Sequence, residues 1–248
     1  MLQFGKSGVD QMNIDVISTD IFDTILLRNS SCGRRHFLEL SQRMARKLKS
    51  AGYCLNAEDI LWARNEAQAL AYRAIEIERP EGDVRLEHIL RLQARLLGLP
   101  SSASEVLHEA EFECEVHALK PNWPLLDRLA LFRKQGKRII GISDTYLPET
   151  MLVRLLGKVA NGHPIETIYS SSDWGVTKKS SRLFEKVIAA ERMVAQRILH
   201  CGDNRLADYL MARKAGLQAL LIERPRYVRD WRKLDALLFL IKHPAHSW

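Results

Sequence analysis

Residues 14–24 of the chain read IDVISTDIFDT. The apolar and β-branched residues of Ile14–Thr19 are typical of a strand that is buried on both faces, as in a parallel sheet. Asp20 follows at the point where that strand is expected to end. Because ligands bind at the carboxyl ends of the strands in open α/β sheets, Asp20 is the first candidate for a functional side chain.

Four further runs have the same apolar character, and amphipathic stretches of helical length, such as 150–159 and 181–194, separate them. The five strands expected from these runs cover residues 14–19, 138–142, 165–170, 198–201 and 217–222. Strand and helix alternate after the second strand. This alternation predicts an α/β fold with a doubly wound, Rossmann-like parallel sheet.

The long interval between the first and second strands contains no convincing strand. Apolar residues recur there at i, i+3, i+4 and i+7 in four stretches, which predicts helices over residues 34–50, 57–77, 84–97 and 102–118. Ser102 with Glu105 resembles a capping box at the start of the fourth. We therefore expect an α/β core of residues 1–27 and 121–248, with an inserted helical cap of residues 28–120 over the carboxyl ends of the strands.

The composition is that of an ordinary soluble globular protein: 248 residues, 46% hydrophobic and 27% charged. No apolar run is long enough for a membrane span and no signal peptide is apparent, so a cytoplasmic location is expected. The four cysteines are far apart and make no CxxC pair, which favours reduced thiols. The net charge of +7 is concentrated after residue 120, but no nucleic-acid-binding motif accompanies it, so no nucleic acid partner is expected.

Polar and charged side chains follow four of the predicted strands, or come shortly after them. In chain order, the clusters are Asp20, Asp23 and Thr24; Ser143 and Asp144; Lys178; and Gly202, Asp203, Asn204 and Asp208. One such cluster is more often a helix cap or a loop end. Four of them at one edge of a parallel sheet indicate a shared site.

This set of side chains suits phosphoryl transfer, which needs an in-line nucleophile, a divalent cation and positive charge around the phosphate oxygens. Asp20 can act as the nucleophile and form an acyl-phosphate. Asp20 and Asp203 can bind Mg²⁺, with Asp208 or Asn204 nearby. Lys178 would offset the negative charge, and the Ser143 hydroxyl would donate a hydrogen bond to a phosphate oxygen.

In order and spacing, these clusters resemble the four motifs of the haloacid dehalogenase (HAD) superfamily over nearly the whole chain. The matching segments are STDIFDT, IIGISDTYLP, the lysine six residues before Phe184, and GDNRLAD. The resemblance implies a helical cap between the first two motifs. It also implies Mg²⁺ as the cofactor, held by Asp20, Asp203, Asp208 and the backbone carbonyl of Phe22. The phrases DIFDTILLR, ISDTYLP and TKKSSRLF resemble predicted bacterial hydrolases associated with glycosyltransferases and surface-polysaccharide assembly.

Phe22 is a departure from the family pattern. The family's phosphatases carry an aspartate two residues after the nucleophile, where it acts as general acid and base. Asp23 lies one residue further on, and strand-like alternation would point its side chain away from that of Asp20 unless a bulge intervenes. An aromatic residue at this position resembles the family's dehalogenases, which work without magnesium. The acidic pair of Asp203 and Asp208 argues instead for a metal site.

The main hypothesis is a magnesium-dependent phosphatase or phosphotransferase acting on a small organic phosphate: a sugar, polyol or nucleotide-sugar metabolite. The expected catalytic residues are Asp20, Asp23, Ser143 and Lys178, and the expected substrate-binding residues are Thr24, Ser143, Asp144 and Arg28. The alternatives are a dehalogenase-type hydrolase and a degenerate scaffold module with a glycosyltransferase partner. Phe22 and the basic, aromatic segment 224–233 motivate the scaffold hypothesis. A helix over 229–241 would place Trp231, Leu234, Leu238 and Ile241 on one face, expected to pack on the core.

Overall fold

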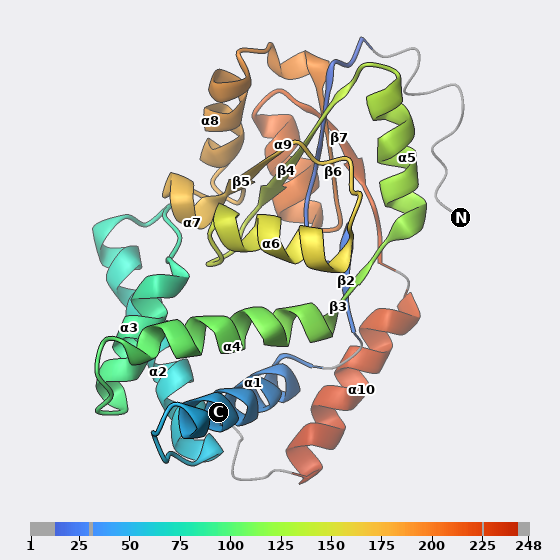
Figure 1. Cartoon of the computed structure of the whole chain (residues 1–248). Coiled ribbons are helices and arrows are strands. Elements are labelled where there is room, and N and C mark those ends of the chain that lie inside the picture. The colour runs from blue at the N-terminus through green and yellow to red at the C-terminus, as the bar shows by residue number, and fades with distance from the viewer. Residues whose placement is uncertain (1–12, 30–31, 225, 243–248) are drawn as a thin grey trace. The chain divides into compact units, whose positions relative to one another are not determined.

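The computed structural model describes residues 13–29, 32–224 and 226–242 (Figure 1). Its contacts divide the chain into two compact units. The core unit comprises Met1–Leu27, Glu81–Asp83 and Lys120–Glu223, and the helical unit comprises Arg28–Pro80, Val84–Leu119 and Arg224–Trp248. Two of the points where the chain passes between the units lie in two short paired strands, β2 (Leu26–Arg28) and β3 (Leu119–Pro121).

The core unit is built on a five-stranded sheet with the strand order β5-β4-β1-β6-β7, and every pairing in it is parallel. The strands are β1 (Val16–Thr19), β4 (Arg138–Ser143), β5 (Thr167–Ser170), β6 (Ile198–Gly202) and β7 (Gln218–Leu221). All five lie within one or two residues of the predicted runs. The predicted α/β fold with a doubly wound parallel sheet is therefore confirmed.

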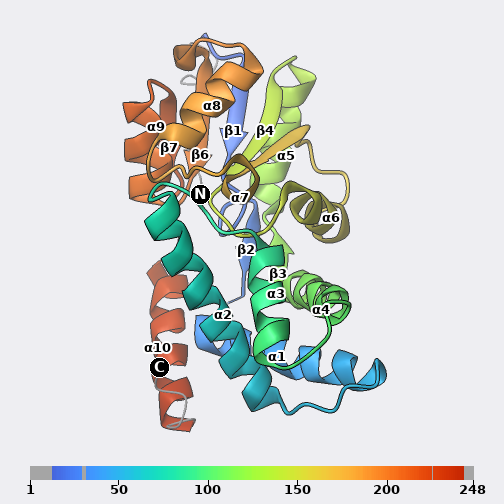
Figure 2. The ribbon, with the colours of Figure 1, turned by 90° about the vertical axis from the view of Figure 1, so that its left-hand side faces the viewer.

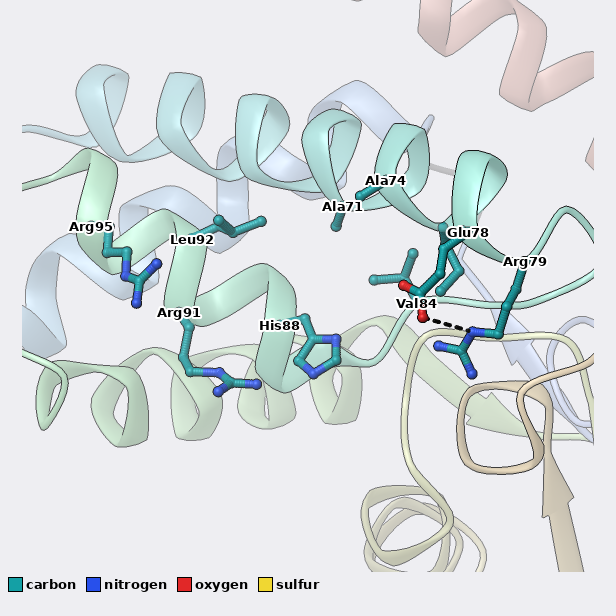
Figure 3. Close-up of a pocket in the computed structure, with 10 residues that line it drawn as sticks. Ala71, Ala74, Glu78, Arg79, Val84, His88, Arg91, Leu92 and Arg95 are labelled. Carbon is teal, nitrogen blue, oxygen red and sulfur yellow. Dashed lines mark ion pairs between the residues drawn. The ribbon is translucent and has the colours of Figure 1, made fainter.

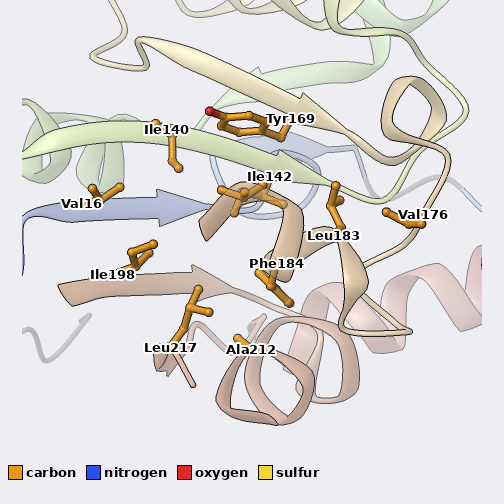
Figure 4. Packing of buried hydrophobic residues seen from close by; sticks show 11 residues of the cluster. Val16, Ile140, Ile142, Tyr169, Val176, Leu183, Phe184, Ile198, Ala212 and Leu217 are labelled. Carbon is orange, nitrogen blue, oxygen red and sulfur yellow. The ribbon is translucent and has the colours of Figure 1, made fainter. Parts of the chain in front are cut away.

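Helices lie on both sides of this sheet, with α8 and α9 on one side and α5 and α6 on the other (Figure 2). The helices of this unit are α5 (Trp123–Lys134), α6 (Glu149–Val159), α7 (Ser171–Trp174), α8 (Arg182–Glu191) and α9 (Met211–Lys214). A 3₁₀ turn (Ala195–Arg197) precedes β6, and a π-helical turn (Arg205–Leu210) precedes α9. Leu183 and Phe184 of α8 pack with Ile140 and Ile142 of β4, which fixes α8 against the sheet (Figure 4).

The helical unit contains the four helices that the apolar periodicity predicts, together with a fifth near the end of the chain. They are α1 (Gly33–Ser50), α2 (Ala57–Glu78), α3 (Leu86–Leu96), α4 (Ala103–Ala118) and α10 (Arg226–Lys242). Asn56 caps α2 by accepting a hydrogen bond from the Asp59 amide. The capping box expected at Ser102 does not form, because Ser102 already has helical backbone angles and its side chain makes no capping bond.

Helix α10 differs from the sequence interpretation, which placed residues 121–248 in the core. The structure groups this helix with the helical unit, because Asp235 accepts hydrogen bonds from Arg35 at 2.7 Å and from the Cys32 amide at 2.8 Å. Among the α10 residues whose side chains the structure describes, Phe239 is the buried one. The expected packing stripe is wrong: its members, Trp231, Leu234, Leu238 and Ile241, are all exposed.

Three residues of the sequence between α2 and α3 belong to the core unit by their contacts. The Glu81 carbonyl accepts a hydrogen bond from the Thr177 amide at 3.1 Å, and the Glu81 carboxylate pairs with Arg182 at 2.6 Å. Ser171 donates a hydrogen bond to Asp83 at 2.6 Å. The core unit is thus completed by a segment from the middle of the predicted cap.

The four cysteines are free thiols, of which Cys54 is exposed and the others are buried, as the sequence predicts. No helix in the described part of the chain has both the length and the apolar character needed to cross a membrane.

Candidate active site

The site lies at the edge of the sheet where β1, β4 and β6 end. Thr19, the last residue of β1, pairs with Gly141 on one side and Cys201 on the other, so the three strands end at nearly the same level. Asp20 and Asp203 follow two of these strands directly. Carboxylate oxygens of Asp20, Asp203 and Asp208 all lie within 4.8 Å of one another. The structure therefore brings these aspartates together at one edge of the sheet, as the sequence predicts.

Lys178 links two of the carboxylates. Its ammonium donates to Asp20 Oδ1 and to Asp208 Oδ1, each at 2.6 Å, and all three side chains are buried. One buried positive charge thus faces two buried carboxylates and can offset the charge of only one of them. The neighbouring Lys179 is exposed, which agrees with the choice of Lys178 from the spacing to Phe184.

Asp144 holds the Lys178 loop in place. Its Oδ1 accepts a hydrogen bond from the Lys178 amide at 2.6 Å, and its Oδ2 accepts one from the Lys179 amide at 3.2 Å. The carboxylate that the sequence assigns to substrate binding is thus engaged with backbone amides. Ser143 is buried at the end of β4, directly before Asp144.

The pKa values of the cluster follow from burial and mutual charge. Burial raises the pKa of Asp20 to about 7; Lys178 opposes this shift and Asp208 reinforces it. Burial alone would lower the pKa of Lys178, but Asp20 and Asp208 outweigh it and raise that pKa. Burial also disfavours ionised Asp208, yet Lys178 and His200 hold its pKa well below the usual range. Lys178 and Asp208 therefore form a charged pair at neutral pH, and Asp20 is the group that titrates there.

Asp208 is fixed from several directions. It lies in the π-helical turn 205–210, and its Oδ2 accepts a hydrogen bond from the Asn204 amide at 2.9 Å. His200 Nε2 lies 3.2 Å from Asp208 Oδ1, and His200 Nδ1 lies 2.9 Å from the Ser18 hydroxyl. Burial lowers the pKa of His200, so the ring is neutral. Since the Asp208 carboxylate can only accept, Nε2 carries the proton and Nδ1 accepts from Ser18.

Gly202 is required by the close approach of Asp208. A Cβ at residue 202 would lie 2.3 Å from Asp208 Cγ and 2.4 Å from Oδ2. Thr24 closes the cluster on another side, with its hydroxyl 3.4 Å from Asp20 Oδ2 and 3.5 Å from Asp203 Oδ1. The backbone and side chains around the aspartates thus leave their carboxylates little freedom.

The segment after Asp20 is a turn and does not continue the strand. Phe22 forms an isolated bridge with Leu26, and Asp23 has a left-handed backbone conformation (φ 58°) with its amide donating to the Leu26 carbonyl at 2.7 Å. The alternation used to orient Phe22 and Asp23 therefore does not apply, because the chain leaves the sheet at Asp20. The catalytic role of Asp23 and the metal-binding role of the Phe22 carbonyl stay predictions.

Arg28 belongs to the helical unit. Its Nη1 donates to Glu115 Oε1 at 3.1 Å and lies 2.9 Å from Oε2 of the same buried carboxylate. His36 Nε2 lies 3.2 Å from Glu115 Oε1 as well. The predicted substrate contact of Arg28 stays a prediction.

Ser18, His200 and Gly202 are the members of the site without a predicted role. A single histidine in a strand whose other residues are apolar was the available signal for His200. It is a weak one, because a histidine in such a place is usually a packed core residue.

The three aspartates fit a divalent cation by the chemistry of their donors. Mg²⁺ prefers oxygen ligands and usually takes one or two protein carboxylates. Asp20, Asp203 and Asp208 offer such oxygens within one small region beside a buried ammonium. A cation there would relieve the excess of buried negative charge that Lys178 leaves.

No protein-family model matches the sequence, and no curated protein matches it. Solved structures do share its fold. A 2-haloacid dehalogenase from Pseudomonas syringae is 18% identical with a TM-score of 0.58, over 84% of this chain and 86% of that one. The HAD hydrolase YfnB of Bacillus subtilis, solved with magnesium, is 17% identical with a TM-score of 0.52, over 84% and 88%. The L-2-haloacid dehalogenase of Xanthobacter autotrophicus is 15% identical with a TM-score of 0.52, over 86% and 78%. The chain has the fold of the HAD hydrolases.

Proposed function

We propose that this protein is a HAD-type hydrolase that uses Mg²⁺ to cleave a phosphate monoester through an aspartyl-phosphate at Asp20. The observation that carries the proposal is the buried cluster of Asp20, Asp203 and Asp208 with the Lys178 ammonium 2.6 Å from two of its members. Such a site concentrates a nucleophile, cation ligands and a fixed positive charge where a phosphate would bind. The magnesium in YfnB, which has the same fold, supports it.

In the proposed reaction, an Asp20 oxygen attacks phosphorus, and the bond from phosphorus to the leaving oxygen breaks. Lys178 and the hydroxyls of Ser143 and Thr24 would stabilise the phosphoryl oxygens. Water then cleaves the aspartyl-phosphate, releasing inorganic phosphate and restoring Asp20. Bound Mg²⁺ would offset the combined charge of phosphate and carboxylates, held by Asp20, Asp203, Asp208 and the Phe22 carbonyl.

The proposed substrate is a small organic phosphate: a sugar, polyol or nucleotide-sugar metabolite. An association with a glycosyltransferase and a cytoplasmic location remain predictions from the sequence. Since Phe22 cannot donate a proton, the leaving group must be a good one or must take its proton from elsewhere, such as Asp23.

The test is a screen of metabolite phosphates with and without Mg²⁺, using the full chain and Asp20→Asn. We expect turnover only with Mg²⁺, and a loss of about 10⁴-fold or more in Asp20→Asn, as found when a catalytic nucleophile is removed. Beryllofluoride, which mimics a phosphoryl group on a carboxylate, should bind the Mg²⁺-loaded wild type. Metal-independent turnover, or full activity in Asp20→Asn, would overturn the mechanism.

Dehalogenation is the second candidate, and Phe22 together with the fold match to two haloacid dehalogenases favours it. In that reaction Asp20 would attack carbon and displace halide. Release of chloride from 2-chloropropionate without added metal, combined with no phosphatase activity, would assign this reaction instead. Turnover of neither substrate class, with beryllofluoride also unbound, would favour the scaffold alternative.

Phe22→Asp should distinguish a phosphatase that lacks its general acid from a site adapted to another reaction. A carboxylate at this position would supply general acid and base catalysis, typically worth about 10²–10⁴-fold in rate. We expect faster turnover of aryl phosphates, or faster hydrolysis of the aspartyl-phosphate, measured by single-turnover kinetics. Phe22→Ala is the matched control, because it removes the ring without adding the acid. Folded Phe22→Asp protein no faster than Phe22→Ala would contradict this account of Phe22.

A further inference from the structure

A hollow of about 280 Å³ lies between α2 and α3 of the helical unit (Figure 3). Its apolar lining consists of Ala71, Ala74, Ile75, Val84 and Leu92. Ala71 and Ala74 lie one turn apart on α2, and these small side chains leave the space toward Leu92 unfilled. Helix pairs normally fill such space with larger side chains, because packed interiors hold few voids. The hollow is therefore a feature that a ligand could fill.

Basic side chains surround this apolar lining. His88, Arg91 and Arg95 project from successive turns of α3, and Arg79 projects from the end of α2 (Figure 3). Glu78 is the only acidic lining residue, and it lies 3.7 Å from Arg79. Among the described residues, the hydrogen-bond acceptor of Arg91 is the Glu87 carbonyl of its own helix. Within the described residues, no carboxylate forms an ion pair with His88, Arg91 or Arg95.

Other arginines of the same unit are paired. The pairs are Arg28 with Glu115, Arg35 with Asp235, Arg43 with Glu113, and Arg64 with Glu111. Arg91 and Arg95 thus carry charge that no carboxylate of the described chain neutralises. A ligand that matches it must be anionic.

We propose that the hollow between α2 and α3 binds a small amphiphilic anion, a carboxylate or phosphate carried on an aliphatic chain or aromatic ring. The apolar body would fill the space between Ala74 and Leu92. The charged head would accept hydrogen bonds from the guanidinium groups of Arg91 and Arg95, which match planar carboxylates and phosphates. The volume of about 280 Å³ lies just below the roughly 300–1,000 Å³ of small-molecule sites, so the ligand is small.

The test uses the full chain and isothermal titration calorimetry, with saturation-transfer NMR as a second readout. Octanoate and octyl phosphate are the probes, octanol keeps the chain without the charge, and acetate keeps the charge without the chain. We expect saturable binding of at least one probe with a Kd of about 1 mM or tighter. Octanol and acetate should bind at least about 10-fold more weakly, since each lacks one of the two matching parts. The stronger of the two probes identifies the head group.

Three variants locate the binding. Arg91→Gln and Arg95→Gln should each weaken the better probe by about 10-fold, as expected for loss of a charge-assisted hydrogen bond. Ala74→Leu should fill the hollow and abolish binding while leaving the melting temperature unchanged or higher. Arg46→Gln, at an exposed position of α1, is the matched charge control and should bind like the wild type. Failure of both probes to bind, equal binding of octanol, or full binding by Ala74→Leu would overturn the proposal.

Discussion

Gly202→Ala is expected to disrupt the aspartate cluster and to lower the free energy of unfolding by about 3–5 kcal/mol. The added methyl would lie 2.3 Å from Asp208 Cγ, closer than real Cβ contacts. Asp208 cannot move aside without cost, because Lys178, His200 and the Asn204 amide all hold its carboxylate. Displacing it would leave the buried Lys178 ammonium with one carboxylate partner fewer. Urea denaturation and calorimetric titration with Mg²⁺ would measure the two effects.

Gly157→Ala is the matched control. Gly157 lies within α6, and a Cβ there would meet no heavy atom within 4 Å. This change should be neutral or stabilise by about 0.4–1 kcal/mol, because alanine favours the helix. If Gly202→Ala kept wild-type stability and Mg²⁺ affinity, the close approach of Asp208 would have no energetic importance.

His200→Leu is expected to weaken Mg²⁺ binding by about 10–100-fold, the usual effect of removing a group that orients a metal ligand. Leucine fills much of the imidazole volume but provides neither the hydrogen bond to Asp208 nor the acceptor for Ser18. We also expect a loss of about 2–4 kcal/mol in stability, because a buried carboxylate loses a donor and Phe184 loses its edge-on ring contact.

Two further variants separate positioning from packing. Ser18→Ala keeps the histidine but frees its Nδ1, so Mg²⁺ affinity should fall by less than in His200→Leu. His163→Asn changes a half-buried histidine of the same unit, whose Nδ1 accepts from the Ile165 amide, and should alter stability without altering Mg²⁺ affinity. If His200→Leu lowered stability but bound Mg²⁺ like the wild type, His200 would be a packing residue only.

The sheet and the aspartate cluster could be predicted because both depend on simple geometry. Strands that are buried on both faces leave apolar runs in the sequence, and β4 and β6 therefore began at the predicted residues. Because β1 and β6 are parallel neighbours that end at one level, Asp20 and Asp203 lie close together, and this does not depend on the conformation of the loops. The choice of Lys178 over Lys179 depended on the family's spacing to Phe184, because composition does not distinguish two adjacent lysines.

The features that could not be predicted depend on contacts between distant residues. Helix α10 is held by Asp235 with Arg35 and Cys32, about two hundred residues earlier in the chain, and a local apolar stripe carries no information on that pairing. The turn at Phe22 and Asp23 removes the strand alternation that would orient their side chains, because Asp23 adopts a left-handed conformation that aspartate tolerates better than most residues. The place of His200 in the site could not be predicted, because its contact with Asp208 depends on the π-helical turn 205–210.

The segment Glu81–Asp83 bears on whether the helical insert is an interchangeable part. Cutting the chain at β2 and β3 and joining the ends would also delete the hydrogen-bond and ion-pair partners that Ser171, Thr177 and Arg182 have in this segment. Thr177 directly precedes Lys178, so the lost contact is next to the ammonium partner of Asp20. A chimera carrying a foreign insert would need an equivalent acidic tripeptide between its second and third helices. The inserted sequence therefore contributes Glu81–Asp83 to the core unit, and it cannot be exchanged without replacing their contacts.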